Sequence, residues 1–287
     1  MNLLTVNDLS AEALGEILAL SESMNLGTPL AGQGVALVFE KPSARTRNSM
    51  EMAVVQLGGH PVYIQGDEVG IGKRETPEDV ARTLACYHSV IAARVNDHRL
   101  LQAMAAATAK PVLNMLSDSD HPLQALADLL TIKQLLGRVD GARVAYVGDG
   151  NNNVARSLAQ ACSLAGAELT IASPTAYRLA DLPYIHHVTD PSAAIAGADV
   201  VYTDVWISMG QDAEAAARRE ALKDYRIDAA LMSAAPNAWF MHCLSANRGE
   251  EVSDDVIDGP RSAVWKQAEN RMHSARGALA WLMGVRP

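Results

Sequence analysis

Residues 39–47, Phe-Glu-Lys-Pro-Ser-Ala-Arg-Thr-Arg, join a strand end to a helix start that carries two arginines. The apolar run 35–39 predicts a buried strand, Pro42 ends it, and Ser43 is a suitable N-cap for the following helix. A helix start presents unpaired backbone N–H groups and the positive end of a dipole. Hydroxyl and guanidinium groups at this position predict a seat for a dianion, most simply phosphate. The alternative is a capped surface helix with two solvated arginines.

Two more polar positions in the first half of the chain are candidates for site residues. Arg94 follows the apolar run 90–93, and an arginine at the end of a buried strand must find an anion or reach solvent. Pro122 suits the first position of a helix, which puts His121 and Gln124 at the mouth of that helix. The alternative for His121 is a capping or core histidine.

In the second half of the chain, polar side chains again follow predicted strands. Asp204 and Ser208 come after a strand near 199–202, and a carboxylate with a hydroxyl group can hold an ammonium group. Ordinary loop capping is the alternative for this pair. Cys243 follows a strand near 238–241, where a lone cysteine is usually a small buried hydrophobe. On spacing alone, a functional thiol is therefore the minority interpretation.

Residues 148–153, Gly-Asp-Gly-Asn-Asn-Asn, follow a predicted strand at 143–147 and open a helix, which is the setting of a dinucleotide-binding turn. The stretch lacks the three-glycine spacing that lets a pyrophosphate approach the backbone. A nicotinamide cofactor is therefore disfavoured. The remaining interpretations are a simple strand–helix turn and a turn that presents an asparagine amide to a ligand.

The whole chain has 287 residues, which suits two domains, and its hydrophobic share of 49% is enough for sizeable cores. A net charge of −9 disfavours nucleic acid or an anionic membrane as the main partner. Cys86, Cys162 and Cys243 are far apart and odd in number, so no disulfide framework or zinc pattern follows and a reducing cytoplasm is expected. Cys86 and Cys162 lie in apolar helical patterns and are predicted to be core residues. We expect no signal peptide and no membrane span.

Strands and helices alternate along the chain, which predicts an α/β fold of two domains, each a mostly parallel sheet flanked by helices. The predicted strands are 35–39, 61–64, 90–93, 111–114, 143–147, 168–172, 199–202 and 238–241. The predicted domains are 1–136 and 137–261, with a hinge at 137–141 and a last helix, 262–287, that packs back on the first domain. Residues 65–76 are expected to form a glycine-rich loop or lid. The polar residues at the strand ends are expected to converge on one cleft.

Taken together, these stretches resemble the ornithine carbamoyltransferases of the aspartate/ornithine carbamoyltransferase family. The matching stretches are 39–47, 121–124, 204–210, 242–244, 249–259 and 269–273, in the family's order. The similarity covers nearly the whole chain, and Asp-Val-Trp-Ile-Ser-Met-Gly at 204–210 is similar to the ornithine branch rather than the aspartate branch. The resemblance implies a carbamoyl-phosphate domain, an ornithine domain, a homotrimer, and no metal or organic cofactor.

The resemblance also implies a reaction, in which the side-chain amine of L-ornithine attacks carbamoyl phosphate and gives L-citrulline and phosphate. The implied carbamoyl-phosphate contacts are Ser43, Ala44, Arg45, Thr46, Arg47, Gly70, Arg94, His121, Gln124, Cys243, Leu244 and Arg271. The implied ornithine contacts are Asn153, Asp204, Ser208 and Met209. The implied catalytic residues are Arg94 and His121, which polarise the carbamoyl oxygen, and Cys243, which faces the amine. Such an enzyme mainly positions its reactants, an effect that can be worth about 7–11 kcal/mol.

Several positions depart from the family pattern and cluster around the implied site. They are Ala44, Gly70, Val95, Leu123, Ser245 and Asn247. Ala44 removes a hydroxyl group from the phosphate seat, and Ser245 replaces the proline of a bond that is typically cis in the family. Three hypotheses remain: a working ornithine carbamoyltransferase, a paralogue that carbamoylates another amine, and a non-catalytic ligand-binding relative.

Overall fold

The computed structural model describes residues 1–179, 182, 184–208 and 211–287. The chain divides into two compact units, which we call unit 1 and unit 2. Unit 1 contains residues 1–130 together with the final segment 270–287, and unit 2 contains residues 131–269. The divisions fall inside two long helices, α6 (Pro122–Leu136) and α12 (Val264–Leu282). The end of the chain therefore belongs to the same unit as its beginning.

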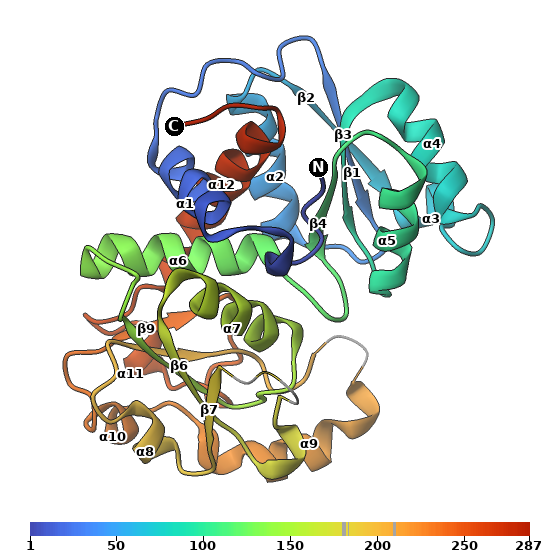
Figure 1. Ribbon diagram of the computed structural model, residues 1–287. Coiled ribbons are helices and arrows are strands. Elements are labelled where there is room, and N and C mark those ends of the chain that lie inside the picture. The colour runs from blue at the N-terminus through green and yellow to red at the C-terminus, as the bar shows by residue number, and fades with distance from the viewer. Residues whose placement is uncertain (180–181, 183, 209–210) are drawn as a thin grey trace. The chain divides into compact units, whose positions relative to one another are not determined.

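Unit 1 is built on a parallel sheet of four strands in the order β2-β1-β3-β4 (Figure 1). Its strands are β1 (Gly34–Phe39), β2 (His60–Gln65), β3 (His88–Arg94) and β4 (Val112–Leu116). The strand order reverses between β1 and β3, and Phe39 pairs in register with Arg94 there. Ligands of such sheets bind beyond the carboxyl ends of the strands at this switch point. The loop after Phe39 and the side chain of Arg94 therefore begin at the same edge.

Helices cover both faces of this sheet (Figure 1). They are α1 (Ala11–Glu22), α2 (Ala44–Gln56), the short α3 (Gly66–Val69), α4 (Pro77–Tyr87) and α5 (His98–Ala107), with a 3-10 turn, η1, at Val6–Asp8. Side chains of α4 and α5 pack on one face against residues of β1 and β3. The other face carries α1, α2 and the end of α12, where Gly277 approaches α1 so closely that a Cβ atom would lie 2.8 Å from the Ile17 carbonyl oxygen.

Unit 2 repeats the plan with five parallel strands in the order β7-β6-β5-β8-β9. The strands are β5 (Arg143–Val147), β6 (Glu168–Ala172), β7 (Ile185–Val188), β8 (Val200–Thr203) and β9 (Trp239–His242). The helices are α7 (Asn153–Ala165), α8 (Pro191–Ile195), α9 (Ala215–Leu222), α10 (Ala229–Met232) and α11 (Asp254–Ile257), with 3-10 turns η2 (Thr175–Tyr177), η3 (Asp212–Glu214) and η4 (Lys223–Tyr225). The switch point lies between β5 and β8, so residues 148–153 and Asp204 begin at the same edge.

The predicted fold class is confirmed, because both sheets are parallel and flanked by helices, and the end of α12 packs in unit 1. The described residues include no helix that is both long enough and apolar enough to cross a membrane. Two local predictions were incomplete: β7 was not expected, and the loop 65–76 contains α3. One was wrong, because Cys86 is exposed rather than in the core, whereas Cys162 is buried as expected.

Candidate functional site

The start of α2 in unit 1 has the local structure that the sequence predicts for an anion seat. Ser43 is the N-cap, and its hydroxyl oxygen accepts a hydrogen bond from the Thr46 N–H at 3.4 Å while donating to Thr46 Oγ1 at 3.1 Å. The first turn of α2 holds no acidic side chain, whereas the first turn of α4 holds Glu78 and Asp79. Because carboxylates in a first turn neutralise the helix dipole, α2 keeps its positive end available and α4 does not.

A buried cationic cluster lies beside this helix start. Arg94 is 6% exposed, and its guanidinium group donates to Thr46 Oγ1 at 3.5 Å. His121 and Arg271 are also buried, and Arg271 donates to the Met115 carbonyl at 3.5 Å. Burial, Arg271 and Arg94 together hold the pKa of His121 well below its usual range. The imidazole is therefore neutral at pH 7, and the cluster combines two fixed positive charges with a neutral hydrogen-bonding ring.

Two predicted phosphate contacts, Arg47 and Gly70, have other surroundings. Arg47 donates to Glu51 Oε1 at 2.8 Å, and its guanidinium carbon lies 3.9 Å from the centre of the Tyr63 ring, so it already has an anionic and an aromatic partner. Ala44 and Arg45 are the first two residues of α2 and so belong to the helix turn that forms the anion seat. Gly70 lies outside that seat, as the C-cap of α3.

Gly70 has a backbone conformation that explains why a glycine is present. Its φ of +64° is in the left-handed region, and a Cβ atom there would lie 2.9 Å from Cβ of Arg74. Arg74 itself donates to the Glu68 carbonyl. A residue with a side chain at position 70 would be strained in this turn, so the departure from the family's glutamine suits the local structure.

A second cluster lies at the switch point of unit 2. Asp204 follows β8 and is 6% exposed, and Cys243 follows β9 and donates from its thiol to Asp204 Oδ1 at 3.1 Å. Burial raises the pKa of Asp204, against the lowering effects of His242 and the Cys243 hydrogen bond. Asp204 and Cys243, which were predicted separately as site residues, are therefore in contact, and the carboxylate can hold a proton-bearing nitrogen.

The loop after β9 is organised by a buried histidine. His242 Nδ1 accepts a hydrogen bond from the Leu244 N–H at 2.9 Å, so the ring proton must be on Nε2, which lies 3.2 Å from Glu251 Oε1. Leu244–Ser245 is a cis peptide bond, as it typically is with proline in the family that the sequence resembles.

Ligand atoms of Asp204, His242 and Cys243 lie within 4.8 Å of one another, which is compatible with a metal site by distance. Both ring nitrogens of His242 have the hydrogen bonds described above, so only a carboxylate and a thiol remain as donors. A catalytic zinc site takes three protein ligands. The donor set therefore does not fit such a site.

Asn152 and Asn153, in the turn after β5, have different structural roles. Asn152 is the N-cap of α7: its amide oxygen accepts from the Ala155 N–H at 2.7 Å, and its amide nitrogen donates to the Tyr146 hydroxyl at 2.9 Å. Asn153, the predicted ornithine contact, is the first residue of α7. The pKa of Tyr146 is raised well above its usual range by burial, by Asp204 and by Asp149.

The loop after Asp204 is held by a buried ion pair that the sequence did not reveal. Arg218 on α9 donates to Asp149 Oδ2 at 2.8 Å and to the Trp206 carbonyl at 3.4 Å. Ser208 donates from its N–H to Gln211 Oε1 at 2.9 Å. Met209, also a predicted ornithine contact, lies outside the described residues. The position of Asp149 in the glycine turn after a strand was a weak sequence indication of a functional role. No sequence pattern indicated Arg218, because its partner is 69 residues away.

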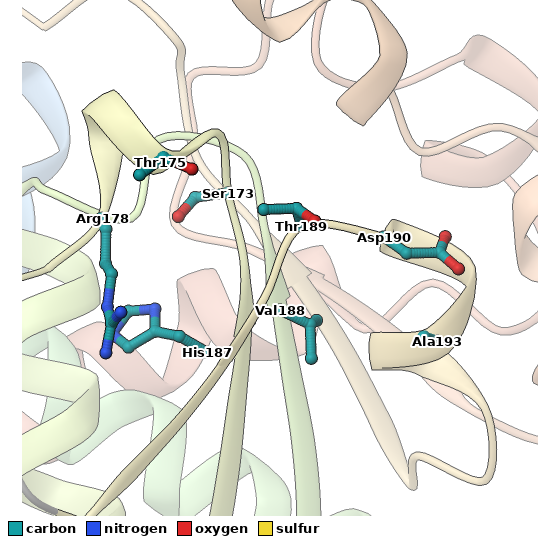
Figure 2. Close-up of a pocket in the computed structure, with 8 residues that line it drawn as sticks. All are labelled: Ser173, Thr175, Arg178, His187, Val188, Thr189, Asp190 and Ala193. Carbon is teal, nitrogen blue, oxygen red and sulfur yellow. The ribbon is translucent and has the colours of Figure 1, made fainter.

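A hollow of about 410 Å³ opens beyond the ends of β6 and β7 (Figure 2). It is lined by Ser173, Thr175, Arg178, His187, Val188, Thr189, Asp190 and Ala193. Arg178 and His187 lie beside each other there, and burial and the arginine charge lower the pKa of His187. The lining includes no predicted site residue, so the candidate site consists of the clusters at the two switch points.

Comparisons with known proteins show which family the two units resemble. Residues 1–134 match the carbamoyl-phosphate binding domain model of aspartate/ornithine carbamoyltransferases, and residues 140–282 match their aspartate/ornithine binding domain model. The ornithine carbamoyltransferase of Hyperthermus butylicus is 46% identical over 98% of this chain and 97% of its own length. The anabolic ornithine carbamoyltransferase of Pyrococcus furiosus is 42% identical over 99% of this chain and 96% of its own length.

Solved structures lead to the same group. The ornithine carbamoyltransferase structure from Pyrococcus furiosus has a TM-score of 0.94 at 42% identity and covers 99% of this chain and 97% of that chain. The structure from Thermus thermophilus has a TM-score of 0.91 at 40% identity and covers 98% of each chain. With two family models spanning nearly all of its sequence and relatives of this similarity, the chain belongs to the aspartate/ornithine carbamoyltransferase family.

Proposed function

We propose that this chain is an ornithine carbamoyltransferase, which transfers the carbamoyl group of carbamoyl phosphate to the side-chain amine of L-ornithine and releases L-citrulline and phosphate. The observation that carries the proposal is the cationic cluster of unit 1, where Thr46, Arg94, His121 and Arg271 gather at the positive end of α2. The amine-facing pair of Asp204 and Cys243 in unit 2 supports it. Relatives named ornithine carbamoyltransferase at 42–46% identity point to the same reaction.

Unit 1 would bind the donor. Ser43, Arg45 and Thr46, with the backbone N–H groups of the first turn of α2, hold the phosphate group, and Ala44 contributes only its backbone. Charge on the phosphate oxygens increases as the C–O bond breaks, so preorganised donors stabilise the transition state more than the ground state. Arg94 bridges this seat to the carbamoyl oxygen because it already contacts Thr46.

The neutral His121 completes the donor site as a hydrogen-bond donor to the carbamoyl oxygen. A protonated imidazole next to two guanidinium groups would be repelled, and the lowered pKa of His121 avoids this. Gln124 and the Leu244 carbonyl accept hydrogen bonds from the carbamoyl NH₂ group. Arg47 and Gly70 remain proposed contacts of the donor, although Arg47 already has Glu51 and Tyr63 as partners.

Unit 2 would bind the acceptor, with Asn153, Ser208 and Met209 around the α-amino and carboxylate groups of ornithine. Asp204 holds a proton-bearing nitrogen of the substrate, and Cys243 faces the side-chain amine. The neutral amine forms a C–N bond to the carbamoyl carbon, the C–O bond to phosphate breaks, and the departing phosphate takes the surplus proton of the nitrogen. No covalent intermediate with the protein is required.

We also propose that the protein is a cytoplasmic homotrimer without a cofactor, which acts in arginine biosynthesis. One relative is named as an anabolic ornithine carbamoyltransferase, which favours the biosynthetic direction. Met52 and Val55 lie three residues apart on α2 and are 46% and 51% exposed. Together with the edge strand β2, they offer apolar surface for contact with another subunit.

Phosphate release from carbamoyl phosphate, measured with four amines in turn, tests this function. The amines are ornithine, putrescine, lysine and aspartate, and citrulline is quantified alongside. We expect release only with ornithine, in step with citrulline. Release with another amine would instead favour the paralogue that carbamoylates a different amine, and binding of carbamoyl phosphate without turnover would favour the non-catalytic relative.

A further inference from the structure

We propose that Asp128 is a positioning residue that fixes the orientation of the Gln124 carboxamide and so makes the site select a donor with an NH₂ group. The proposal rests on the proposed function and deepens it. Gln124 and Asp128 are four residues apart on α6, so their side chains share one face of the helix. Both are buried, and Gln124 Nε2 donates to Asp128 Oδ1 at 2.9 Å.

The two ends of a carboxamide differ in hydrogen-bonding ability, and Asp128 determines which end is left for a ligand. Oδ1 of Asp128 accepts the hydrogen bond that Gln124 Nε2 donates. It therefore engages the amide nitrogen of Gln124 and leaves the amide oxygen as the free acceptor. In a buried setting the reversed amide would place its oxygen against the carboxylate, with two acceptors facing each other and neither satisfied.

A carbamoyl group offers N–H donors next to its carbonyl, and an acetyl group offers a methyl group at the same place. The amide oxygen of Gln124, which Asp128 keeps turned toward the ligand, can accept a hydrogen bond from the carbamoyl NH₂ group. It has no hydrogen-bond donor to bind on the acetyl methyl group. A buried acceptor left without a donor is costly, so the arrangement discriminates against the acetyl compound. Selectivity for the carbamoyl donor thus depends on a side chain that does not itself touch the substrate.

The helix start that carries Gln124 is held in place independently of Asp128. The Gln124 N–H donates to the His121 carbonyl at 3.1 Å, and Ser274 on α12 donates to the Leu123 carbonyl at 3.1 Å. Replacing Asp128 therefore leaves these two backbone hydrogen bonds of the turn in place. This separation allows a test of orientation rather than of folding.

The test measures the affinities of carbamoyl phosphate and acetyl phosphate for the wild-type protein and for Asp128→Asn. An asparagine can donate to the Gln124 oxygen and so reverse the carboxamide, which presents an NH₂ group to the carbamoyl NH₂. We expect carbamoyl phosphate to bind about tenfold more weakly, which is about 1.4 kcal/mol. Acetyl phosphate has no donor at that position, and we expect its affinity to stay within about twofold.

Two further variants make the result specific. The first is a double-mutant cycle with Gln124→Ala, which removes the carboxamide through which Asp128 acts. In this background, Asp128→Asn should change neither the carbamoyl phosphate affinity nor the acetyl phosphate affinity further. Gln134→Ala, at an exposed position of the same helix, should leave both affinities unchanged. If Asp128→Asn does not fold, Asp128→Ala serves the same purpose, since it frees the carboxamide and should narrow the preference for carbamoyl over acetyl phosphate.

Equal weakening of both compounds would overturn the positioning role and assign Asp128 to the phosphate seat or to general stability. An unchanged ratio of the two affinities would overturn it as well. If the wild-type protein binds neither compound, the proposed function itself is wrong, an outcome that the wild-type measurement identifies before any variant is compared.

Discussion

Units 1 and 2 have the same architecture and opposite electrostatics at their switch points. In unit 1 the strand ends deliver Arg94 and the cationic start of α2, and burial with the surrounding positive charge lowers the pKa of His121. In unit 2 they deliver Asp149 and Asp204, and burial with these carboxylates raises the pKa of Tyr146. The parallel sheet therefore fixes where a ligand binds, and the side chains after each strand decide the charge of the ligand.

The overall charge of −9 makes this contrast more informative. A protein of this charge repels anions at long range, so the anion seat of unit 1 must depend on a few local groups. Removing one of those groups should have a large and selective effect. Corresponding changes in unit 2 should affect the cationic substrate alone.

The largest effect is expected from Arg94→Ala. This change removes the guanidinium group that bridges Thr46 to the carbamoyl oxygen, and loss of one such preorganised donor costs about 10²–10³-fold in kcat. Steady-state kinetics with both substrates varied should show the fall in kcat with little change in the KM for ornithine. If the main change is instead in the KM for ornithine, the assignment of carbamoyl phosphate to unit 1 and of ornithine to unit 2 is wrong.

A smaller effect is expected from Asp204→Asn, which keeps the shape of the side chain and removes its charge. A charged hydrogen bond contributes about 1.5–3 kcal/mol, so the KM for ornithine should rise about 10–100-fold. The dissociation constant of carbamoyl phosphate, measured by titration calorimetry, should stay within about twofold. Parallel losses for both ligands would show that Asp204 supports the fold rather than the amine.

The lowered pKa of His121 predicts a pH dependence of stability. The unfolded chain takes up a proton below the ordinary pKa of 6.5, and the folded protein does not until its own lower pKa is reached. Stability is therefore lost as pH falls from 6.5, by up to about 1.4 kcal/mol per pH unit from this group. Urea unfolding between about pH 7 and 5 should show a shallower fall for His121→Gln, and equal slopes would contradict the buried neutral ring.

The smallest effect is expected from Ala44→Thr, which adds a hydroxyl group at the first position of α2. One additional neutral hydrogen bond to the phosphate group contributes about 0.5–1.5 kcal/mol, so carbamoyl phosphate should bind about 2–10-fold more tightly. Ala11→Thr, at the exposed first position of α1 and outside the seat, is a matched control that should leave this affinity unchanged. If Ala44→Thr binds carbamoyl phosphate more weakly, the seat has no room for a larger side chain beside the phosphate group at this position.

Much of the fold followed from local patterns, because an apolar run and a cap residue determine elements such as β1 and α2. The edge strand β7, Ile-His-His-Val, has too little apolar character to be recognised and is paired on one side, to β6. Cys86 was misplaced because the buried face of α4 is formed by Val80, Ala81 and Leu84, and the cysteine lies off that face.

The candidate site was predictable where the parallel-sheet rule gathers residues, as for Thr46 and Arg94, which are 48 positions apart. It was not predictable where a buried partner comes from an irregular polar segment. Arg218 and Asp149 form such a pair, and Glu251 reaches His242 in the same way. These contacts depend on how α9 and the loop before α11 fold back, for which the sequence has no periodic signal.

Arg271 reaches the cationic cluster of unit 1 from the last segment of the chain, 270–287. During synthesis on the ribosome, the nascent chain can form all four strands of the first sheet long before this arginine has been translated. The cationic cluster is therefore complete only after residue 271 has been added. A message that stops before codon 271 would yield a product that lacks this arginine and also lacks the part of α12 that packs against α1.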